Sequence, residues 1–260
     1  MQPAAETVLI TGASSGIGLE LARGFAAEGS NLILVARNLD ALEKLAAELT
    51  SHHQVKVRRL RADLSRPETP ARIYAELAGL GVRVDVLVNN AGFGLQGEFP
   101  GLSLPRQLEI IQVNLAALTH LTGLFLPAMI QRGSGGVLNV GSVAGFLPGP
   151  NLAVYYASKA FVLSFTEALA AETSGTGLKI SVLCPGPTES NFGWVARGGR
   201  PRPFERRKMS ARAVARAGLR GFRAGKVVVV PGAANRALAF LPRLLPRRLA
   251  RWGVKRYNGL

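Results

Sequence analysis

The stretch TVLITGASSGIG at residues 7–18 joins a short apolar run to a glycine-rich loop that leads into a helical pattern. The β-rich run at Thr7–Ile10 predicts a strand, and apolar residues at helical spacing from Ile17 up to a stop at Gly29 predict a helix. Glycines let a backbone approach a pyrophosphate closely, and a helix N-terminus offers free N–H groups and positive potential. The spacing G-x-x-x-G-x-G differs from the commoner G-x-G-x-x-G, but its place between strand and helix indicates a dinucleotide phosphate site.

Further apolar runs alternate along the chain with segments of helical periodicity. We predict strands at 7–10, 32–36, 55–60, 84–88, 137–140, 180–183 and 227–230. We predict helices over 39–49, over 104–126 with Pro127 near its end, through Tyr155, and over 211–222 with Ser210 as the N-cap. This alternation is typical of an α/β fold, here a single-domain Rossmann-type doubly wound parallel sheet of about seven strands with helices on both faces.

The chain divides unevenly by charge. Its net charge is +16, yet residues 1–196 carry a net −1 and residues 197–260 a net +17, with Glu205 as the only acid there. We assign residues 1–232 to the dinucleotide-binding and catalytic domain, with a lid at about 188–222. We assign residues 233–260 to a basic, leucine- and arginine-rich C-terminal extension packed on or beside that domain.

Three interpretations of the basic segment FLPRLLPRRLARWGVKRY at 240–257 stay open. It forms a solvated face that covers a subunit interface or the lid, or it binds anionic membrane lipid through its leucines, tryptophan and arginines. The third interpretation is contact with an acidic partner, such as a carrier protein that delivers substrate. A nucleic-acid partner is not expected, because no recognised binding motif accompanies the charge.

The remaining composition points to a cytoplasmic protein. Cys184 is the only cysteine, which excludes an internal disulfide and fits a reducing compartment. The N-terminus lacks the basic and apolar regions of a secretory signal. We also see no uninterrupted apolar run long enough to span a bilayer.

A candidate catalytic pair lies after the predicted strand at 137–140. Tyr155 and Lys159 are four residues apart on a predicted helix and therefore share one face. An ammonium beside a phenol lowers the pKa of the phenol toward neutrality, where a general acid or base works best. Ser142, on the preceding loop, offers a hydroxyl that would polarise a carbonyl. The alternative is a half-buried helix tyrosine with a solvated lysine; Tyr156 has no lysine at the matching offset.

Other residues at predicted strand ends suit the rest of a dinucleotide. Arg37 directly follows the second strand, where an arginine accommodates the 2′-phosphate of NADP, unless it only faces solvent. Asp63 would accept a hydrogen bond from adenine or cap the following turn. The small residues at 89–92 suit close contact with a ligand or a tight βα turn. Asn114 is polar among apolar helix positions, so it must be hydrogen-bonded or functional.

With these motifs in one order, the chain resembles the short-chain dehydrogenase/reductase family over roughly residues 7–190. The sequence at 139–169 is similar to a bacterial, NADP-dependent branch of this family, whose members often have no assigned substrate. The motifs are TGASSGIG at 11–18, NNAG at 89–92, Asn114, Ser142, YYASK at 155–159 and PGPT at 185–188.

The resemblance implies roles for individual residues. Tyr155 would exchange the proton with the carbonyl or alcohol, Lys159 would hold the nicotinamide ribose and lower the tyrosine pKa, and Ser142 would orient the substrate oxygen. Asn114 would hold a relay water through a local distortion of its helix. The resemblance also implies which residues contact the cofactor. The phosphates would contact Gly12, Ser14, Ser15, Gly16, Ile17 and Gly18, and the 2′-phosphate would contact Arg37. Adenine would lie beside Asp63 and Leu64, the adenosine beside Asn90, Ala91 and Gly92, and the nicotinamide beside Pro185, Gly186 and Thr188.

The chain departs from many NADP-preferring relatives at one point. Ser14 and Ser15 stand where those relatives carry a basic residue in the glycine loop, so the preference for NADP(H) over NAD(H) depends on Arg37 alone. The resemblance also implies a homo-oligomer, a dimer or tetramer. We expect no metal site.

We therefore expect an NADP(H)-dependent oxidoreductase that interconverts a carbonyl and a secondary alcohol. Large apolar residues near the predicted lid and cleft suggest a fairly apolar substrate, although each would equally pack the lid onto the core. They are Phe93, Phe146, Leu147, Phe192, Trp194 and Phe204. The alternative is a non-catalytic NADP-binding regulatory or scaffold protein on the same fold.

Overall fold

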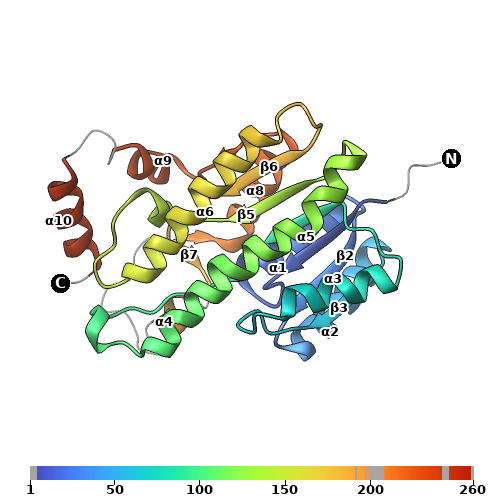
Figure 1. Cartoon of the computed structure of the whole chain (residues 1–260), viewed down its shortest axis with the longest axis horizontal. Helices are drawn as coiled ribbons and strands as arrows, with labels where there is room; N and C mark the ends of the chain where they lie inside the picture. The colour runs from blue at the N-terminus through green and yellow to red at the C-terminus, as the bar shows by residue number, and fades with distance from the viewer. Residues whose placement is uncertain (1–4, 191, 197, 199–207, 242–245, 259–260) are drawn as a thin grey trace.

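The computed structural model describes residues 5–190, 192–196, 198, 208–241 and 246–258, without the side chains of 194, 195, 247 and 257. Within this part of the chain, seven parallel strands form one sheet in the order β3-β2-β1-β4-β5-β6-β9 (Figure 1). The fold class predicted from the sequence is confirmed. The strands are β1 Thr7–Thr11, β2 Asn31–Ala36, β3 Val57–Arg61, β4 Val86–Asn89, β5 Gly136–Val140, β6 Lys179–Leu183 and β9 Val228–Val229.

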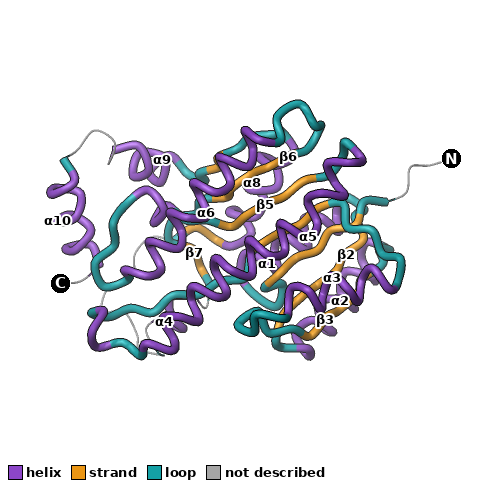
Figure 2. The backbone as a smooth tube through the Cα atoms, viewed as in Figure 1, coloured by secondary structure: helices purple, strands orange, loops and turns teal. Residues whose placement is uncertain are grey.

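Helices cover both faces of this sheet, as the backbone trace makes visible (Figure 2). One face packs against α1 Gly16–Ala27, α2 Leu39–His53 and α8 Ala211–Arg223, with Phe25 and Phe222 fully buried between them. The other face packs against α3 Thr69–Gly79, α5 Ala117–Arg132 and α6 Ala153–Glu172. Because both faces are covered, the inner strands are largely apolar, whereas the edge strand β3 carries exposed arginines.

The strand order reverses between β1 and β4. Strands β2 and β3 lie on one side of β1, whereas β4, β5, β6 and β9 continue on the other side. Val8 pairs with Leu32 on one side and with Val86 on the other. In open parallel sheets the loops at such a switch point diverge and leave a crevice at the carboxyl ends of the strands.

The helix predicted at 104–126 is longer and less regular than expected. It comprises α4 Leu104–Ile111, a π-helical segment η2 at Gln112–Ala116, and α5, so Pro127 lies inside the helix and not at its end. The whole helix, Leu104–Arg132, is long and apolar enough to cross a membrane by length and composition, contrary to the expectation from uninterrupted runs. Leu121, Phe125 and Met129 are buried against the sheet, and core helices meet the same criterion.

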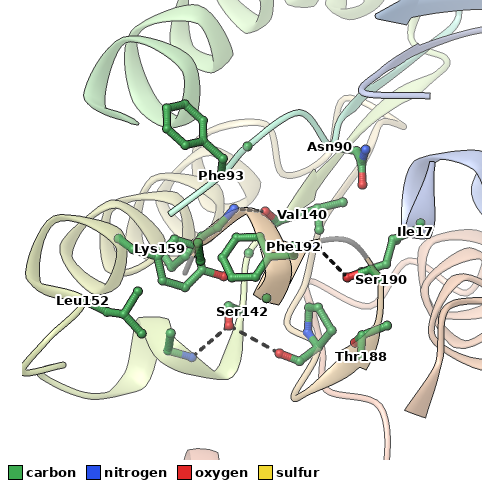
Figure 3. A pocket seen from close by; sticks show the side chains of 18 of the residues that line it. Ile17, Asn90, Phe93, Val140, Ser142, Leu152, Lys159, Thr188, Ser190 and Phe192 are labelled. Atoms are coloured by element: carbon green, nitrogen blue, oxygen red, sulfur yellow. Dashed lines mark hydrogen bonds between the residues drawn. The ribbon is translucent and has the colours of Figure 1, made fainter. Parts of the chain in front are cut away.

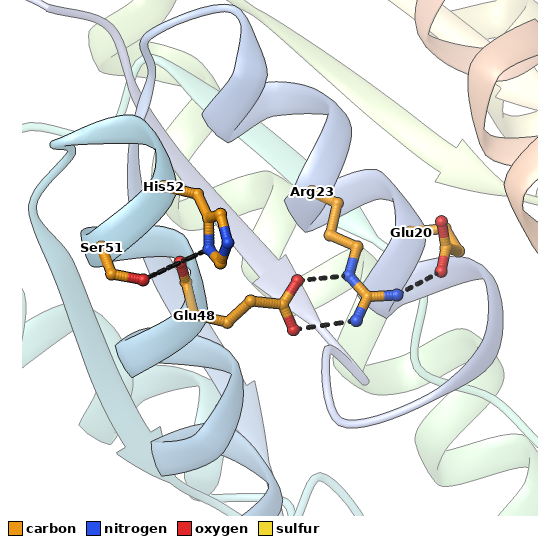
Figure 4. Close-up of polar contacts among 5 residues, drawn as sticks. All are labelled: Glu20, Arg23, Glu48, Ser51 and His52. Carbon is orange, nitrogen blue, oxygen red and sulfur yellow. Dashed lines mark hydrogen bonds and ion pairs between the residues drawn. The ribbon is translucent and has the colours of Figure 1, made fainter.

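Charged contacts join the elements at the surface. Arg23 of α1 donates from Nε and Nη2 to both carboxylate oxygens of Glu48 on α2, at 2.7 and 2.8 Å, and from Nη1 to Glu20 at 2.7 Å (Figure 4). Arg223 at the end of α8 pairs with Glu28 at 2.8 Å and with Glu6, just before β1. Such exposed pairs contribute about 0–1 kcal/mol each, so they orient helices more than they stabilise the fold.

Apart from α8 and β9, the described chain after β6 builds the end of the molecule beyond the sheet. It contains β7 Thr188–Glu189 paired with β8 Met209–Ser210, the short α7 Phe192–Ala196, α9 Ala233–Phe240 and α10 Arg247–Asn258. Short 3₁₀ turns lie at η1 Phe99–Gly101 and η3 Val143–Phe146. The predicted cap is present, since the Ser210 hydroxyl accepts a hydrogen bond from the Ala213 N–H at 3.2 Å.

Candidate active site

A cavity of about 980 Å³ lies across the carboxyl ends of the strands, at the switch point. It brings together the predicted cofactor and catalytic residues, apart from Gly18 and Asn114, which do not line it. Those that line it are Gly12, Ser14, Ser15, Gly16, Ile17, Arg37, Asp63, Leu64, Asn90, Ala91, Gly92, Ser142, Tyr155, Lys159, Pro185, Gly186 and Thr188.

The glycine loop packs too closely for side chains. Gly12 has φ +65°, and a Cβ on it would lie 2.8 Å from the Asn90 side-chain nitrogen. A Cβ on Gly18 would lie 2.4 Å from both that nitrogen and the Gly12 carbonyl oxygen. The Asn90 amide donates to the carbonyls of Thr11 and Gly12, at 2.9 and 3.1 Å. Gly18 therefore acts by packing α1 against the loop.

The N-terminus of α1 presents free backbone donors to the cavity. Ser15 precedes the helix in an extended conformation, and no side chain of the described residues caps its first turn. That turn carries no acidic residue. Unpaired N–H groups and the positive end of the helix dipole suit an anion, so the loop fits the diphosphate of a dinucleotide.

Arg37 and Asp63 line the same cavity at the carboxyl ends of β2 and β3. Arg37 is exposed directly after β2, with no carboxylate in front of it at Ala36. Burial on its own would raise the pKa of Asp63, but hydrogen bonds from Ser65 and the nearby charges of Arg37 and Arg66 lower it overall. Asp63 accepts from the Ser65 N–H at 3.0 Å, as in the predicted turn cap; its contact with adenine stays a prediction.

Ser142 and Lys159 lie near each other in the cavity (Figure 3), which Tyr155 also lines. The Lys159 ammonium donates to the Val140 carbonyl at 2.8 Å and lies 5.8 Å from the centroid of the Tyr155 ring. The Ser142 hydroxyl donates to the Pro185 carbonyl at 3.4 Å and accepts from the Ala144 N–H at 3.1 Å. Serine, tyrosine and lysine thus line the same cavity from two elements, the loop after β5 and helix α6.

The prediction that Lys159 lowers the pKa of Tyr155 toward neutrality is wrong for this structure. Burial raises the pKa of the Tyr155 hydroxyl to about 12, and hydrogen bonding with Ser142 offsets only part of the rise. Burial also lowers the pKa of the Lys159 ammonium to about 8. Both pKa shifts have the same cause, because removing either group from water disfavours its charged form. The tyrosine hydroxyl is therefore protonated at neutral pH and able to donate.

Asn114 lies behind the cavity wall in the π-helical segment, so the predicted distortion of its helix is present. Its side chain accepts from the Phe93 N–H at 3.1 Å and donates to the Phe93 carbonyl and the Ser158 hydroxyl, both at 3.0 Å. It is 1% exposed. The amide thus fixes the loop after β4 against α6, while its role in holding a relay water stays a prediction.

The sequence did not identify the wall that α10 contributes at the end of the cavity away from Arg37. Ala250, Gly253, Val254 and Asn258 of α10 line it, and Val254 packs in one cluster with Tyr156. The Asn258 side chain donates to the Pro150 carbonyl at 2.8 Å, and the backbone carbonyl of Asn258 accepts from the Gln96 side chain at 3.3 Å. The only signal in the sequence was the helical spacing of small residues at 250, 253 and 254.

Several apolar side chains surround the space next to Tyr155. Phe93, Leu147 and Phe192 line the cavity as predicted, and the Phe192 ring lies 4.9 Å from the Tyr155 ring. Phe146 does not line it, because it packs against the buried Leu118 and Val162 cluster. The Trp194 side chain and Phe204 lie outside the described part of the chain.

A parallel sheet with a glycine-rich loop and one long cavity at its switch point defines a dinucleotide-binding α/β protein. The family model for short chain dehydrogenase matches residues 6–198. The chain belongs to the short-chain dehydrogenase family, as its motifs indicated. Membership makes it an oxidoreductase acting on alcohol or carbonyl groups, which confirms the enzyme class expected from the sequence.

Individual relatives agree with this assignment. Sulfoacetaldehyde reductase 2 of Chromohalobacter salexigens is 39% identical over 196 residues, which are 75% of this chain and 77% of that protein. A short-chain dehydrogenase from Sphingobium yanoikuyae, solved with NADPH, has a TM-score of 0.83 at 36% identity and covers 89% of this chain and 90% of its own. The bulky-bulky ketone specific alcohol dehydrogenase of Comamonas testosteroni has a TM-score of 0.79 at 30% identity, covering 93% of each chain.

The buried ammonium predicts a pH-dependent stability. Between pH 8, near the folded pKa of Lys159, and its ordinary value of 10.5, the unfolded chain binds a proton that the folded chain does not. Stability therefore rises with pH in this window, by up to about 1.4 kcal/mol per pH unit. In Lys159→Met this rise is absent, so the free energy of unfolding of the variant falls relative to wild type as the pH increases.

Urea unfolding across this pH range measures the difference. Lys44→Met, at an exposed position of α2, is the control and is expected to follow the wild-type profile. Parallel profiles for Lys159→Met and wild type would contradict the buried-charge account.

Proposed function

We propose that the protein is an NADP(H)-dependent oxidoreductase that interconverts an apolar ketone and its secondary alcohol. The observation that carries the proposal is one continuous cavity, which runs from Arg37 past the glycine loop to Ser142, Tyr155 and Lys159. A dinucleotide with its phosphates at α1 would extend toward Tyr155. The bound reduced nicotinamide supplies the hydride.

The chain's own residues supply the proton and the positioning. Tyr155 donates its hydroxyl proton to the carbonyl oxygen, and the raised pKa keeps that proton in place at neutral pH. Ser142 is held by Pro185 and Ala144, so its hydroxyl is positioned to orient the substrate oxygen. Lys159 uses one of its three donors on Val140, which leaves donors for a ribose and a charge that stabilises the tyrosinate after transfer.

The preference for NADP(H) is supported by charge at the adenosine end. Arg37 lines the cavity with its side chain exposed, so a phosphate there would be paired with a guanidinium. The solved structure from Sphingobium yanoikuyae contains NADPH, in agreement with this proposal. A ribose hydroxyl would gain less from the same arginine, because neutral acceptors form weaker hydrogen bonds.

An apolar substrate is supported by the walls around Tyr155. Phe93, Leu147, Leu152 and Phe192 offer little to a charged group. The Comamonas testosteroni enzyme is named for its specificity for bulky-bulky ketones, which agrees with a large apolar substrate. Sulfoacetaldehyde, which names another relative, is by contrast small and anionic. Leu238 and Leu241 of the α9 region and several residues of α10 build part of the wall. They lie beyond the family match at 6–198, so the relatives' substrates do not transfer directly.

Removing the Tyr155 hydroxyl tests the assignment. Tyr155→Phe is expected to lower kcat/KM for NADPH-dependent ketone reduction by about 10²-fold to 10⁴-fold, the range for loss of a general acid. The dissociation constant for NADPH, measured by fluorescence, is expected to stay within about threefold, because the ring still packs on Phe192.

The neighbouring Tyr156→Phe is the matched control, as Tyr156 lines the same cavity one residue further along α6. It is expected to keep most of the activity. Full activity in Tyr155→Phe would refute the mechanism. NADPH binding by wild type without turnover of any ketone in a broad panel would support the non-catalytic alternative.

Reversing the charge at Arg37 tests the cofactor preference. Arg37→Asp removes a charged partner of the 2′-phosphate and adds repulsion, so the ratio of Kd for NADPH to Kd for NADH is expected to rise at least about tenfold. Arg59→Asp, on the exposed edge strand β3, is the control and should leave the ratio unchanged. An unchanged ratio in Arg37→Asp would overturn the selectivity account.

A further inference from the structure

We infer that the outer face of α9 and α10 docks on an anionic phospholipid surface and that the cavity opens at this face. The two helices lie together at one end of the molecule, away from the β3 edge of the sheet (Figure 1). The docking surface consists of Arg236, Leu238, Phe240, Leu241, Arg248, Leu249, Arg251, Trp252, Lys255 and Arg256, all exposed. The docking itself does not require the proposed reaction.

Helix α10 has two chemically different sides. Arg248, Arg251, Trp252, Lys255 and Arg256 recur at three- and four-residue spacing and form its exposed side. Ala250, Val254 and Asn258 are buried on the opposite side, against the cavity. A helix whose apolar side already packs on its own protein is free to use its cationic side for a partner.

Among the residues that the structure describes, the cations of this face have no carboxylate partners. The sequence contains no acidic residue after Glu205, and none of the ion pairs between described residues includes a cation of α9 or α10. Arg256 instead lies over the Trp252 ring, 5.9 Å from its centroid. Each unpaired cation near an anionic bilayer strengthens binding about fivefold.

Large apolar side chains stand among these cations. Trp252 is 64% exposed, Phe240 58%, and Leu241 and Leu249 54% each. Tryptophan and leucine next to arginine is the composition of helices that lie in the headgroup region, where the rings and aliphatic chains insert and the cations meet phosphate. A bilayer satisfies both kinds of side chain at once.

The other occupants fit less well. A second copy of this chain would bring another excess of positive charge, since each copy carries +16. An acidic protein would pair the arginines but would need complementary apolar pockets for Phe240 and Trp252. Lipid requires no such shape match, so the interleaving of apolar and cationic residues favours it.

The cavity reaches the surface at this face. Leu238, Leu241 and Leu249 line the cavity, and the same three side chains are exposed. An apolar molecule dissolved in the bilayer would therefore enter between α9 and α10 without leaving an apolar environment. This delivery step, unlike the docking, rests on the proposed function.

Vesicle flotation with the full chain tests the docking. We expect binding to vesicles of phosphatidylglycerol and phosphatidylcholine, little binding to phosphatidylcholine alone, and weakening by salt. Replacing Arg248, Arg251, Lys255 and Arg256 by Gln should reduce anionic-vesicle binding at least about tenfold. The matched control replaces Lys56, Arg58, Arg59 and Arg61 by Gln, which removes the same charge from the exposed edge of the sheet at β3.

The outcomes separate the occupants. Loss in the α10 variant with retention in the β3 variant supports the inference. Equal loss in both variants, equal binding to neutral vesicles, or no vesicle binding overturns it. Binding to polyglutamate without binding to vesicles would assign the face to an acidic protein. A change in oligomeric state of the α10 variant, measured by sedimentation and without vesicle binding, would assign it to a second copy.

Delivery predicts a difference between two kinds of substrate. With a long-chain ketone embedded in anionic vesicles, the α10 variant should show an apparent KM raised about tenfold, whereas its KM for a water-soluble ketone should match wild type. Equal KM values for the embedded ketone would overturn delivery from the bilayer. Absence of turnover with every ketone would instead refute the proposed function, and the flotation result would stand by itself.

Discussion

The partial removal of Tyr155 and Lys159 from water is the constraint on which the site depends. Lys159 is buried and Tyr155 is half-buried. Desolvation shifts each pKa toward the neutral form, up for the phenol and down for the ammonium. The Val140 carbonyl holds the ammonium at the end of β5. A buried ammonium destabilises the fold, so its retention is understandable where a charge is needed beside a reacting group. Stability and chemistry are therefore opposed at this lysine.

The sheet turns that local arrangement into a site for two molecules. Parallel strands bring their carboxyl ends to one edge, so the glycine loop after β1 and Ser142 after β5 open into the same cavity although 124 positions separate Gly18 from Ser142. The close approach of Gly12, Gly18 and Asn90 sets the height of α1 above the sheet. The helix N-terminus and the buried hydroxyl are consequently fixed on one rigid frame, which is what transfer between two bound reactants requires.

Much of the fold and the cofactor end could be predicted from the sequence, because they rest on local patterns. Strand ranges such as Leu32–Ala36 and the cap at Ser210 were correct to within a residue or two, and the residues of the glycine loop lie where a dinucleotide fold requires them. Features that depend on distant neighbours could not be predicted. The pKa of Tyr155 depends on the residues that cover it. The packing of Phe146 depends on helices that come before and after it in the chain. The cavity wall depends on the course of the chain after β9.

The position of α10 links substrate choice to the surface of the molecule. Its buried side contributes Ala250, Gly253 and Val254 to the cavity, and Asn258 fixes it to the loop before α6. Its exposed side carries the cations and Trp252. A shift of this helix would thus alter the cavity and the surface together, because one rigid element forms both. An apolar cavity whose wall is also a cationic outer face is suited to substrates that concentrate at a charged, apolar boundary, where their effective concentration is highest.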